Sequence, residues 1–152
     1  MRSKLFVSIV AFVLLFVMVL YFIVNPSYEK SLRAKYYYEI GEYNEAYNLA
    51  KEAFGMDAYN RMAVTVMAQS QTSLKYVTYV KDAKQYINSI GEMAKHEQIS
   101  DADRAKIKMM CNIMIDSYVK LSPSVITDDE LVQEAAAYHE KFEKLLEKVT
   151  KN

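Results

Sequence analysis

Two histidines and one cysteine are the side chains of this 152-residue sequence most suited to metal binding or nucleophilic chemistry. Glu92 lies four residues before His96, a spacing that places both on one face of a helix. Glu134 precedes His139 by five residues and falls on a different face, so neither histidine belongs to a zinc-protease or di-iron motif. We interpret both histidines as solvated polar residues, near a helix end and on a helix flank, and predict no metal site.

The single cysteine, Cys111, follows Met110 on the apolar side of a predicted helix. A buried cysteine behaves as a small hydrophobic residue, whereas a catalytic thiol needs a histidine partner and a polar cleft. One cysteine also excludes an internal disulfide and a multi-cysteine zinc site. Glycine-rich phosphate loops and the GxSxG motif are absent from the sequence. The sequence therefore predicts no catalytic residues, no cofactor and no enzymatic activity.

Composition narrows the class of protein further. The 19 Lys and Arg balance the 19 Asp and Glu, so the surplus of positive charge that phosphate binding requires is missing, and we expect no nucleic-acid partner. With 52% apolar residues, 3 glycines and 2 prolines, the chain is neither a turn-rich β-sandwich nor a disordered linker. The sequence predicts an all-α protein.

Leu5–Val24 is a run of 20 residues in which Ser8 is the only polar member. A helix of this length spans about 30 Å, the thickness of the hydrocarbon core of a bilayer, and this one has no polar face. Asn25-Pro26 ends it, because the residue before a proline is disfavoured in helix. The run exceeds the ~7–15 residues usual in a signal peptide, and no small-x-small cleavage pattern follows it. We predict a cationic tip (residues 1–4), an uncleaved single-pass transmembrane helix (5–24) and one helical domain (25–152).

The charges beside the predicted span bear on its orientation. Arg2 and Lys4 precede it, whereas Lys30, Arg33 and Lys35 follow it. The short cationic tip favours a cytoplasmic amino terminus, with the C-terminal domain in the periplasm of a bacterial cell. The cations after the span leave the opposite orientation open.

Beyond Pro26 the apolar residues recur at steps of three and four, which is typical of amphipathic helices. Ser100-Asp101 and a Thr127–Glu130 capping box mark two helix starts. The pattern predicts about six antiparallel helices after the anchor, over residues 28–40, 44–55, 58–74, 76–95, 101–121 and 128–150.

The interval Gly41–Phe54, read with Tyr37, resembles a tetratricopeptide repeat. The resemblance implies a helix-turn-helix over residues 27–60, with Gly41 in the turn. Small residues let the two helices approach closely, and tyrosines fill the space above them; these positions are Ala34, Ala46, Ala53, Tyr37 and Tyr43. Lys30, Arg33 and Ala58 depart from the repeat pattern. The resemblance also implies a degenerate repeat over 61–95, with Met67 and Ala68 at matching positions, and a capping helix pair over 100–150 that completes a short solenoid.

In tetratricopeptide domains the first helix of each repeat lines a concave groove. Carried over by position, the resemblance places eight residues in a partner-binding groove: Tyr28, Ser31, Lys35, Tyr38, Met62, Thr65, Gln69 and Thr72. Such a neutral, mildly apolar surface suits a peptide or a partner helix. The alternative interpretation is that Tyr28 lies at the lipid interface and Tyr38 packs within the fold.

We therefore expect a single-pass membrane protein that acts as a protein–protein interaction scaffold or assembly factor. Its partners are other proteins of a membrane complex and the bilayer itself, through Leu5–Val24. The layout suggests a component of an envelope machine of the bacterial inner membrane, such as a secretion, division or flagellar-motor complex. The alternative is a membrane-tethered chaperone or quality-control adaptor that binds unassembled client proteins.

Overall fold

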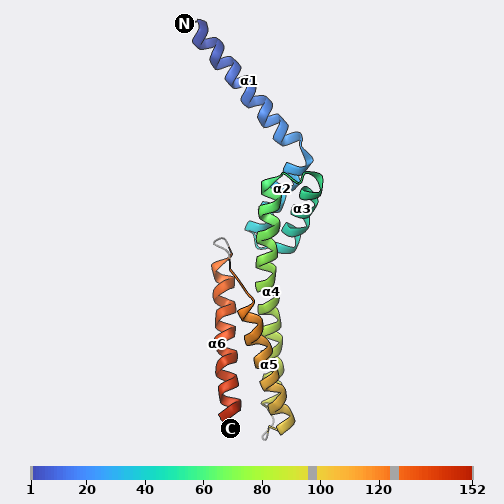
Figure 1. The fold of residues 1–152 in the computed structure, drawn as a ribbon, viewed down its shortest axis with the longest axis vertical. Coiled ribbons are helices and arrows are strands. Elements are labelled where there is room, and N and C mark those ends of the chain that lie inside the picture. The colour runs from blue at the N-terminus through green and yellow to red at the C-terminus, as the bar shows by residue number, and fades with distance from the viewer. Residues whose placement is uncertain (1, 96–98, 124–126, 152) are drawn as a thin grey trace. The chain divides into compact units, whose positions relative to one another are not determined.

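The computed structural model describes residues 2–95, 99–123 and 127–151, without the side chains of residues 2–5, 22 and 23. All regular structure in these ranges is helical, which confirms the all-α class. Six helices follow one another along the chain (Figure 1): α1 (Arg2–Val24), α2 (Pro26–Glu39), α3 (Tyr43–Met56), α4 (Arg61–Met93), α5 (Asp101–Val119) and α6 (Asp129–Lys151). The chain divides into unit 1 (Met1–Ser70) and unit 2 (Gln71–Asn152), and the boundary falls within α4.

The helix α4 corrects the predicted organisation. The two helices expected over 58–74 and 76–95 are one helix of 33 residues. No glycine or proline occurs between Arg61 and Ile90, and the expected break at Leu74–Tyr76 contains no turn residue, so the backbone hydrogen bonds continue. The segment 61–95 is therefore not the helical hairpin that a second repeat requires, and five helices rather than six follow α1 in the described residues.

The helix starts agree with the sequence prediction in one case and differ in another. Ser100 caps α5, because its side chain accepts a hydrogen bond from the amide of Asp103. At α6 the capping residue is Asp128 rather than the predicted Thr127. The Asp128 carboxylate accepts from the amide of Glu130 at 2.9 Å, because α6 begins one residue later than the Thr127 capping box requires.

The long apolar helix α1 ends where Asn25-Pro26 was predicted to end it. Asn25 then caps α2, since its side-chain oxygen accepts from the amide of Ser27 at 3.0 Å, and Pro26 occupies the first turn. In a search of the described residues, no single helix has both the length and the apolar character of a membrane span. Only α1 and α2 taken together have that length and apolar character, and the two helices are bent by 73° relative to each other. Membrane insertion of α1 therefore stays a prediction.

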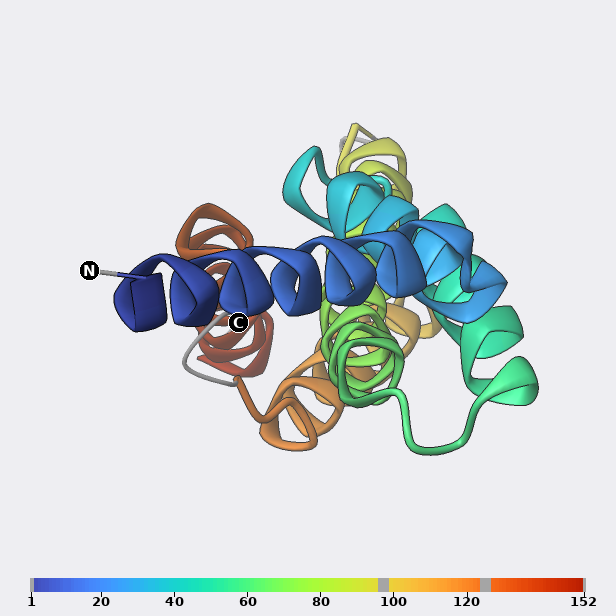
Figure 2. The same ribbon diagram turned by 90° about the horizontal axis from the view of Figure 1, so that it is seen from above.

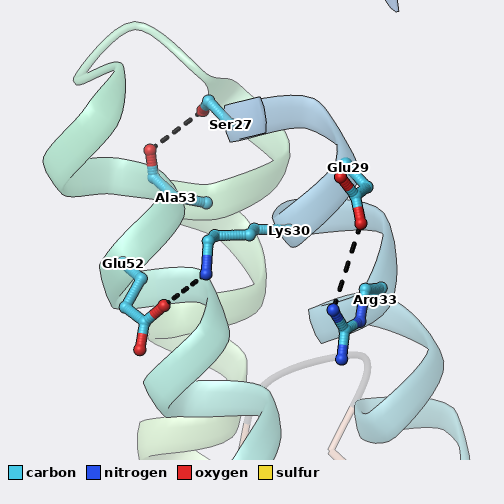
Figure 3. Close-up of polar contacts among 6 residues, drawn as sticks. All are labelled: Ser27, Glu29, Lys30, Arg33, Glu52 and Ala53. Atoms are coloured by element: carbon cyan, nitrogen blue, oxygen red, sulfur yellow. Dashed lines mark hydrogen bonds and ion pairs between the residues drawn. The ribbon is translucent and has the colours of Figure 1, made fainter. Parts of the chain in front are cut away.

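Unit 1 contains the hairpin of α2 and α3, with the first turns of α4 packed against it. Gly41 forms the turn at φ +82°, a left-handed conformation that glycine adopts without strain. Ala34, Ala46 and Ala53 are fully buried, as the predicted close approach of the two helices requires. Lys30 on α2 reaches Glu52 on α3 at 2.6 Å (Figure 3), and this ammonium lowers the pKa of the Glu52 carboxyl.

A buried polar network joins α2, α3 and the start of α4 in unit 1. The Asn60 amide nitrogen donates to the hydroxyls of Ser27 at 2.9 Å and Ser31 at 3.1 Å. Ser27 donates in turn to the carbonyl of Ala53 (Figure 3), and Ser31 donates to the carbonyl of Tyr28. The Asn60 side-chain oxygen accepts from the amide of Ala63 and so caps α4. Every member has a partner, as buried polar groups require.

Unit 2 is built from the C-terminal part of α4 together with α5 and α6, which lie side by side, and α5 runs in the opposite direction to the other two (Figure 1). One apolar cluster joins all three helices, and Phe142 is its largest fully buried side chain. Lys84 on α4 also pairs with Glu134 on α6 at 2.9 Å, and this hydrogen bond raises the pKa of Lys84. Unit 2 is therefore a three-helix arrangement with its own core.

We predict that Asn60→Ala lowers the free energy of unfolding of the full-length chain by about 2–4 kcal/mol. The loss combines a missing helix cap, about 1 kcal/mol, with buried serine hydroxyls that lose a donor, about 1–3 kcal/mol. Urea unfolding followed by circular dichroism measures it. The control is Asn48→Ala at an exposed position of α3, with a change within about 0.5 kcal/mol. Equal stability of the two variants would contradict the role of the network.

Candidate functional site

The structure removes Ser31 from the predicted groove. Its side chain is fully buried and its hydroxyl is bonded to Asn60 and to the carbonyl of Tyr28, so it cannot face a partner. Tyr38 is half-buried against the core of unit 1, with its ring 5.4 Å from the ring of Tyr43. Met62 packs against the same core. These positions serve packing, which agrees with the alternative interpretation of Tyr38.

The remaining groove residues fall in two units. Lys35 and Thr65 are exposed, and Tyr28 and Gln69 are half-buried, all within unit 1. Thr72 belongs to unit 2. The predicted groove assumed two stacked helical hairpins. The structure has the continuous helix α4 in place of the second hairpin. A common surface made by these residues stays a prediction.

Unit 2 contains a groove of about 510 Å³ between α4 and α5, a size in the range of small-ligand and peptide sites. Its apolar wall comes largely from α5 and from Leu121, two residues beyond the end of α5, with Leu74 on α4 adding to it. Its polar wall comes largely from α4, with Lys75 and Asp82 as the charged members. The apolar residues are Leu74, Ile113, Met114 and Leu121. The groove therefore offers apolar contact and charge together.

The two charges of the groove have a defined spacing. Lys75 and Asp82 are seven residues apart, which is two turns of helix and about 10.5 Å along its axis. Opposite charges at this separation match a helical segment with an acidic residue and a basic residue two turns apart. Complementary charges of this kind fix the direction in which a partner binds.

Tyr79 also lines the groove and carries a buried polar group. The side chain is only 4% exposed, and its hydroxyl has no hydrogen-bond partner among the described residues. Burial, together with a smaller effect of the neighbouring Tyr118, raises the pKa of Tyr79 to about 12. The phenol is therefore neutral at physiological pH, and its hydroxyl is enclosed by the fold of unit 2. A buried hydroxyl without a partner is unfavourable by about 1–3 kcal/mol.

An aromatic row runs from Tyr79 through Tyr118 to His139, with one residue from each helix of unit 2. The Tyr79 and Tyr118 ring centroids are 5.7 Å apart, and His139 stacks on Tyr118 at 4.2 Å. The His139 side chain is 21% exposed and its Nε2 lies 3.5 Å from Glu143. The solvated interpretation of His139 is therefore wrong, because α6 turns this helix flank toward Tyr118. His96 lies outside the described residues.

Cys111 is fully buried in the core of unit 2, as predicted. Burial raises the pKa of the thiol, which lowers the fraction of reactive thiolate at neutral pH. Within residues 2–95, 99–123 and 127–151, no three His, Cys, Asp or Glu side chains come together in a group that could hold a metal ion.

Two surfaces were missed by the sequence analysis. The groove depends on the continuity of α4 and on which face of α5 meets it, and neither follows from periodicity alone. Along α2 and its C-cap residue, three large apolar side chains are exposed at steps of four residues: Leu32, Tyr36 and Ile40. That spacing is visible in the sequence, but it predicts a buried stripe rather than an exposed one.

In comparisons with known proteins, no family model, no curated protein and no solved structure matches this chain. The tetratricopeptide resemblance therefore rests on the residues of the α2–α3 hairpin, and function must be argued from the surfaces of the chain itself.

We predict that Tyr79→Phe leaves the chain at least as stable at neutral pH, because it removes a buried hydroxyl that has no partner. In the wild type the unfolded phenol ionises near pH 10 and the folded one near 12. The contribution of the neutral phenol to stability is complete below pH 10 and is lost as the pH rises through 12. Thermal unfolding between pH 9 and 12 should therefore show a shallower decline for Tyr79→Phe. Parallel declines of the two proteins would contradict the burial of this phenol.

Proposed function

We propose that the chain is a membrane-anchored adaptor, in which α1 lies in a lipid bilayer and the other helices bind another protein. One observation carries the proposal. Every side chain from Phe6 to Tyr21 is exposed, and Ser8 is the only polar residue among them. Burying a large apolar side chain is favourable by about 1.5–3 kcal/mol. Together these side chains strongly disfavour contact between α1 and water.

A bilayer fits α1 better than a protein partner does. A helix that packs on one partner keeps a polar face toward water, and α1 has apolar residues on all sides. Lipid surrounds a helix completely, and a helix satisfies its own backbone hydrogen bonds there. Tyr21, near the end of the apolar run, is a residue type enriched where the hydrocarbon core meets the headgroups.

The groove of unit 2 supports binding of a defined protein partner. Lys75 and Asp82 each favour a partner group of opposite charge at a defined place, whereas a chaperone for varied clients benefits from an adaptable surface. The raised pKa values of Tyr79 and Cys111 make both groups less ionised at neutral pH, which favours contact over acid–base or nucleophilic chemistry. We therefore favour a scaffold or assembly factor over a chaperone.

The proposed setting is a complex of the bacterial inner membrane, such as a secretion, division or flagellar-motor assembly. The support is the layout of an apolar helix followed by a hairpin that resembles a tetratricopeptide repeat. In unit 1 the fully buried Ala34, Ala46 and Ala53 agree with that resemblance. At the position of Lys30 the repeat pattern has an aromatic residue that packs between the helices. In this chain Lys30 instead forms an ion pair with Glu52.

We predict that the full-length protein stays with membranes after alkaline extraction, and that Leu14→Arg combined with Leu15→Arg releases it. Each arginine at the centre of a membrane helix costs about 2.5–3.5 kcal/mol on the insertion scale. The matched control adds two arginines at exposed positions, Asn48→Arg and Asn112→Arg, and stays in the pellet. Release of the wild-type chain by alkali alone would contradict membrane anchoring.

For the groove, we predict that Lys75→Glu reduces recovery of the partner about tenfold, which corresponds to about 1.4 kcal/mol. The reason is repulsion between the new carboxylate and an acidic partner residue. The measurement is crosslinking in native membranes followed by quantitative mass spectrometry of the co-purified protein. Lys81→Glu is the matched control, since Lys81 is an exposed lysine of α4 that does not line the groove. Equal losses from both variants would exclude the groove as the binding site.

A further inference from the structure

The connection between α3 and α4 exposes large side chains in unit 1. Tyr59 is 93% exposed, and Met56, at the end of α3, is 54% exposed. Figure 2 shows this connection as an open loop between the two helices. An aromatic ring this exposed makes little contact within its own unit and is accessible from outside it.

Buried hydrogen bonds fix this connection beside the first turn of α2. Asn60 donates to the Ser27 hydroxyl at 2.9 Å, and Ser27 donates to the carbonyl of Ala53 at 2.9 Å (Figure 3). Tyr59 precedes Asn60 directly, and Ala53 lies one turn before the end of α3. The backbone of Tyr59 therefore lies next to the residue that bonds to Ser27, and Met56 belongs to the helical turn that begins at Ala53.

Ser27 is in turn close to the end of α1. Only Asn25 and Pro26 lie between Val24 and Ser27, and these three steps of chain span at most about 11 Å. The headgroup region of a bilayer is roughly 5–8 Å thick on each side of the hydrocarbon core. If Val24 lies at the edge of that core, Tyr59 and Met56 are within reach of the headgroups.

The connection holds Tyr59 in a defined place without using its ring. The Tyr59 amide donates to the Asp57 carboxylate at 2.9 Å, and the Asn60 amide donates to the Asp57 carbonyl at 3.1 Å. The Asp57 amide donates to the carbonyl of Ala53 at the end of α3. Since the backbone is already ordered, inserting the ring into an interface costs little additional conformational entropy.

Building on the proposed anchoring of α1, we propose that Tyr59 and Met56 enter the headgroup region of the same bilayer and seat unit 1 on the membrane surface. Tyrosine favours this region, because its ring is apolar and its hydroxyl stays hydrated. The exposed Arg61, two residues further on, is placed to meet lipid phosphates. A bilayer is the occupant favoured over a protein, because the chain itself tethers this loop next to the lipid.

The test uses tryptophan fluorescence, since the chain contains no tryptophan. Tyr59→Trp, Tyr21→Trp and Val119→Trp are each made in the full-length protein and reconstituted in phosphatidylcholine vesicles with or without brominated acyl chains. Val119 is an exposed residue of unit 2 and serves as the control outside the proposed surface. We expect bromine to reduce emission about twofold or more at positions 59 and 21 and to leave position 119 nearly unchanged.

The outcomes separate the two proposals. Quenching at position 21 without quenching at position 59 overturns the seating of unit 1 and leaves the anchor standing, as expected if a protein partner covers Tyr59. No quenching at either position overturns both proposals. Equal quenching at positions 59 and 119 also overturns the inference, because the signal would then not be specific to this loop.

Discussion

The Asn60 side chain serves two helices at once, and unit 1 depends on both of its ends. Its oxygen caps α4, while its nitrogen donates to two serines of α2. The Ser27 hydroxyl in turn donates a hydrogen bond to the carbonyl of Ala53 in the last turn of α3. Apolar packing alone would let the hairpin slide against α4. Directional hydrogen bonds in a buried setting select one arrangement, since any other leaves polar groups without partners.

The same network gives the proposed function its geometry. It holds the α3–α4 connection beside the start of α2, only three residues beyond the end of α1. In the proposed arrangement, α1 in the bilayer therefore brings this connection of unit 1 to the membrane surface. Unit 2 carries the groove with Lys75 and Asp82. In the proposed function, anchoring and partner binding thus rest on different parts of the chain.

Helix ends, turns and caps depend on a few neighbouring residues, and several of them were predicted from the sequence. Asn25-Pro26 ends α1, Gly41 forms the turn of the hairpin, and Ser100 caps α5. The continuity of α4 was not predicted, because the apolar stripes on either side of Leu74–Tyr76 were assigned to separate helices. The spacing of apolar residues shows that a segment is helical. Whether two such segments form one helix depends on whether a turn residue lies between them.

The candidate sites were harder to predict, because they depend on which elements meet. Ser31 was placed on a binding face by its position in a repeat, yet it is buried against Asn60, 29 residues further along the chain. His139 was taken as solvated, yet it stacks on Tyr118 of another helix. The groove of unit 2 needs α4 and α5 side by side, and no spacing within one helix reveals that.

Hydrogen–deuterium exchange of the full-length protein in lipid nanodiscs tests the central claim most directly. An exposed helix without tertiary cover opens readily in water, whereas a helix inside a bilayer has no water to exchange with. The account predicts that backbone amides from Phe6 to Tyr21 remain protected for hours. Complete exchange of this segment within seconds, with α2–α6 still protected, would contradict the claim that α1 lies in the membrane.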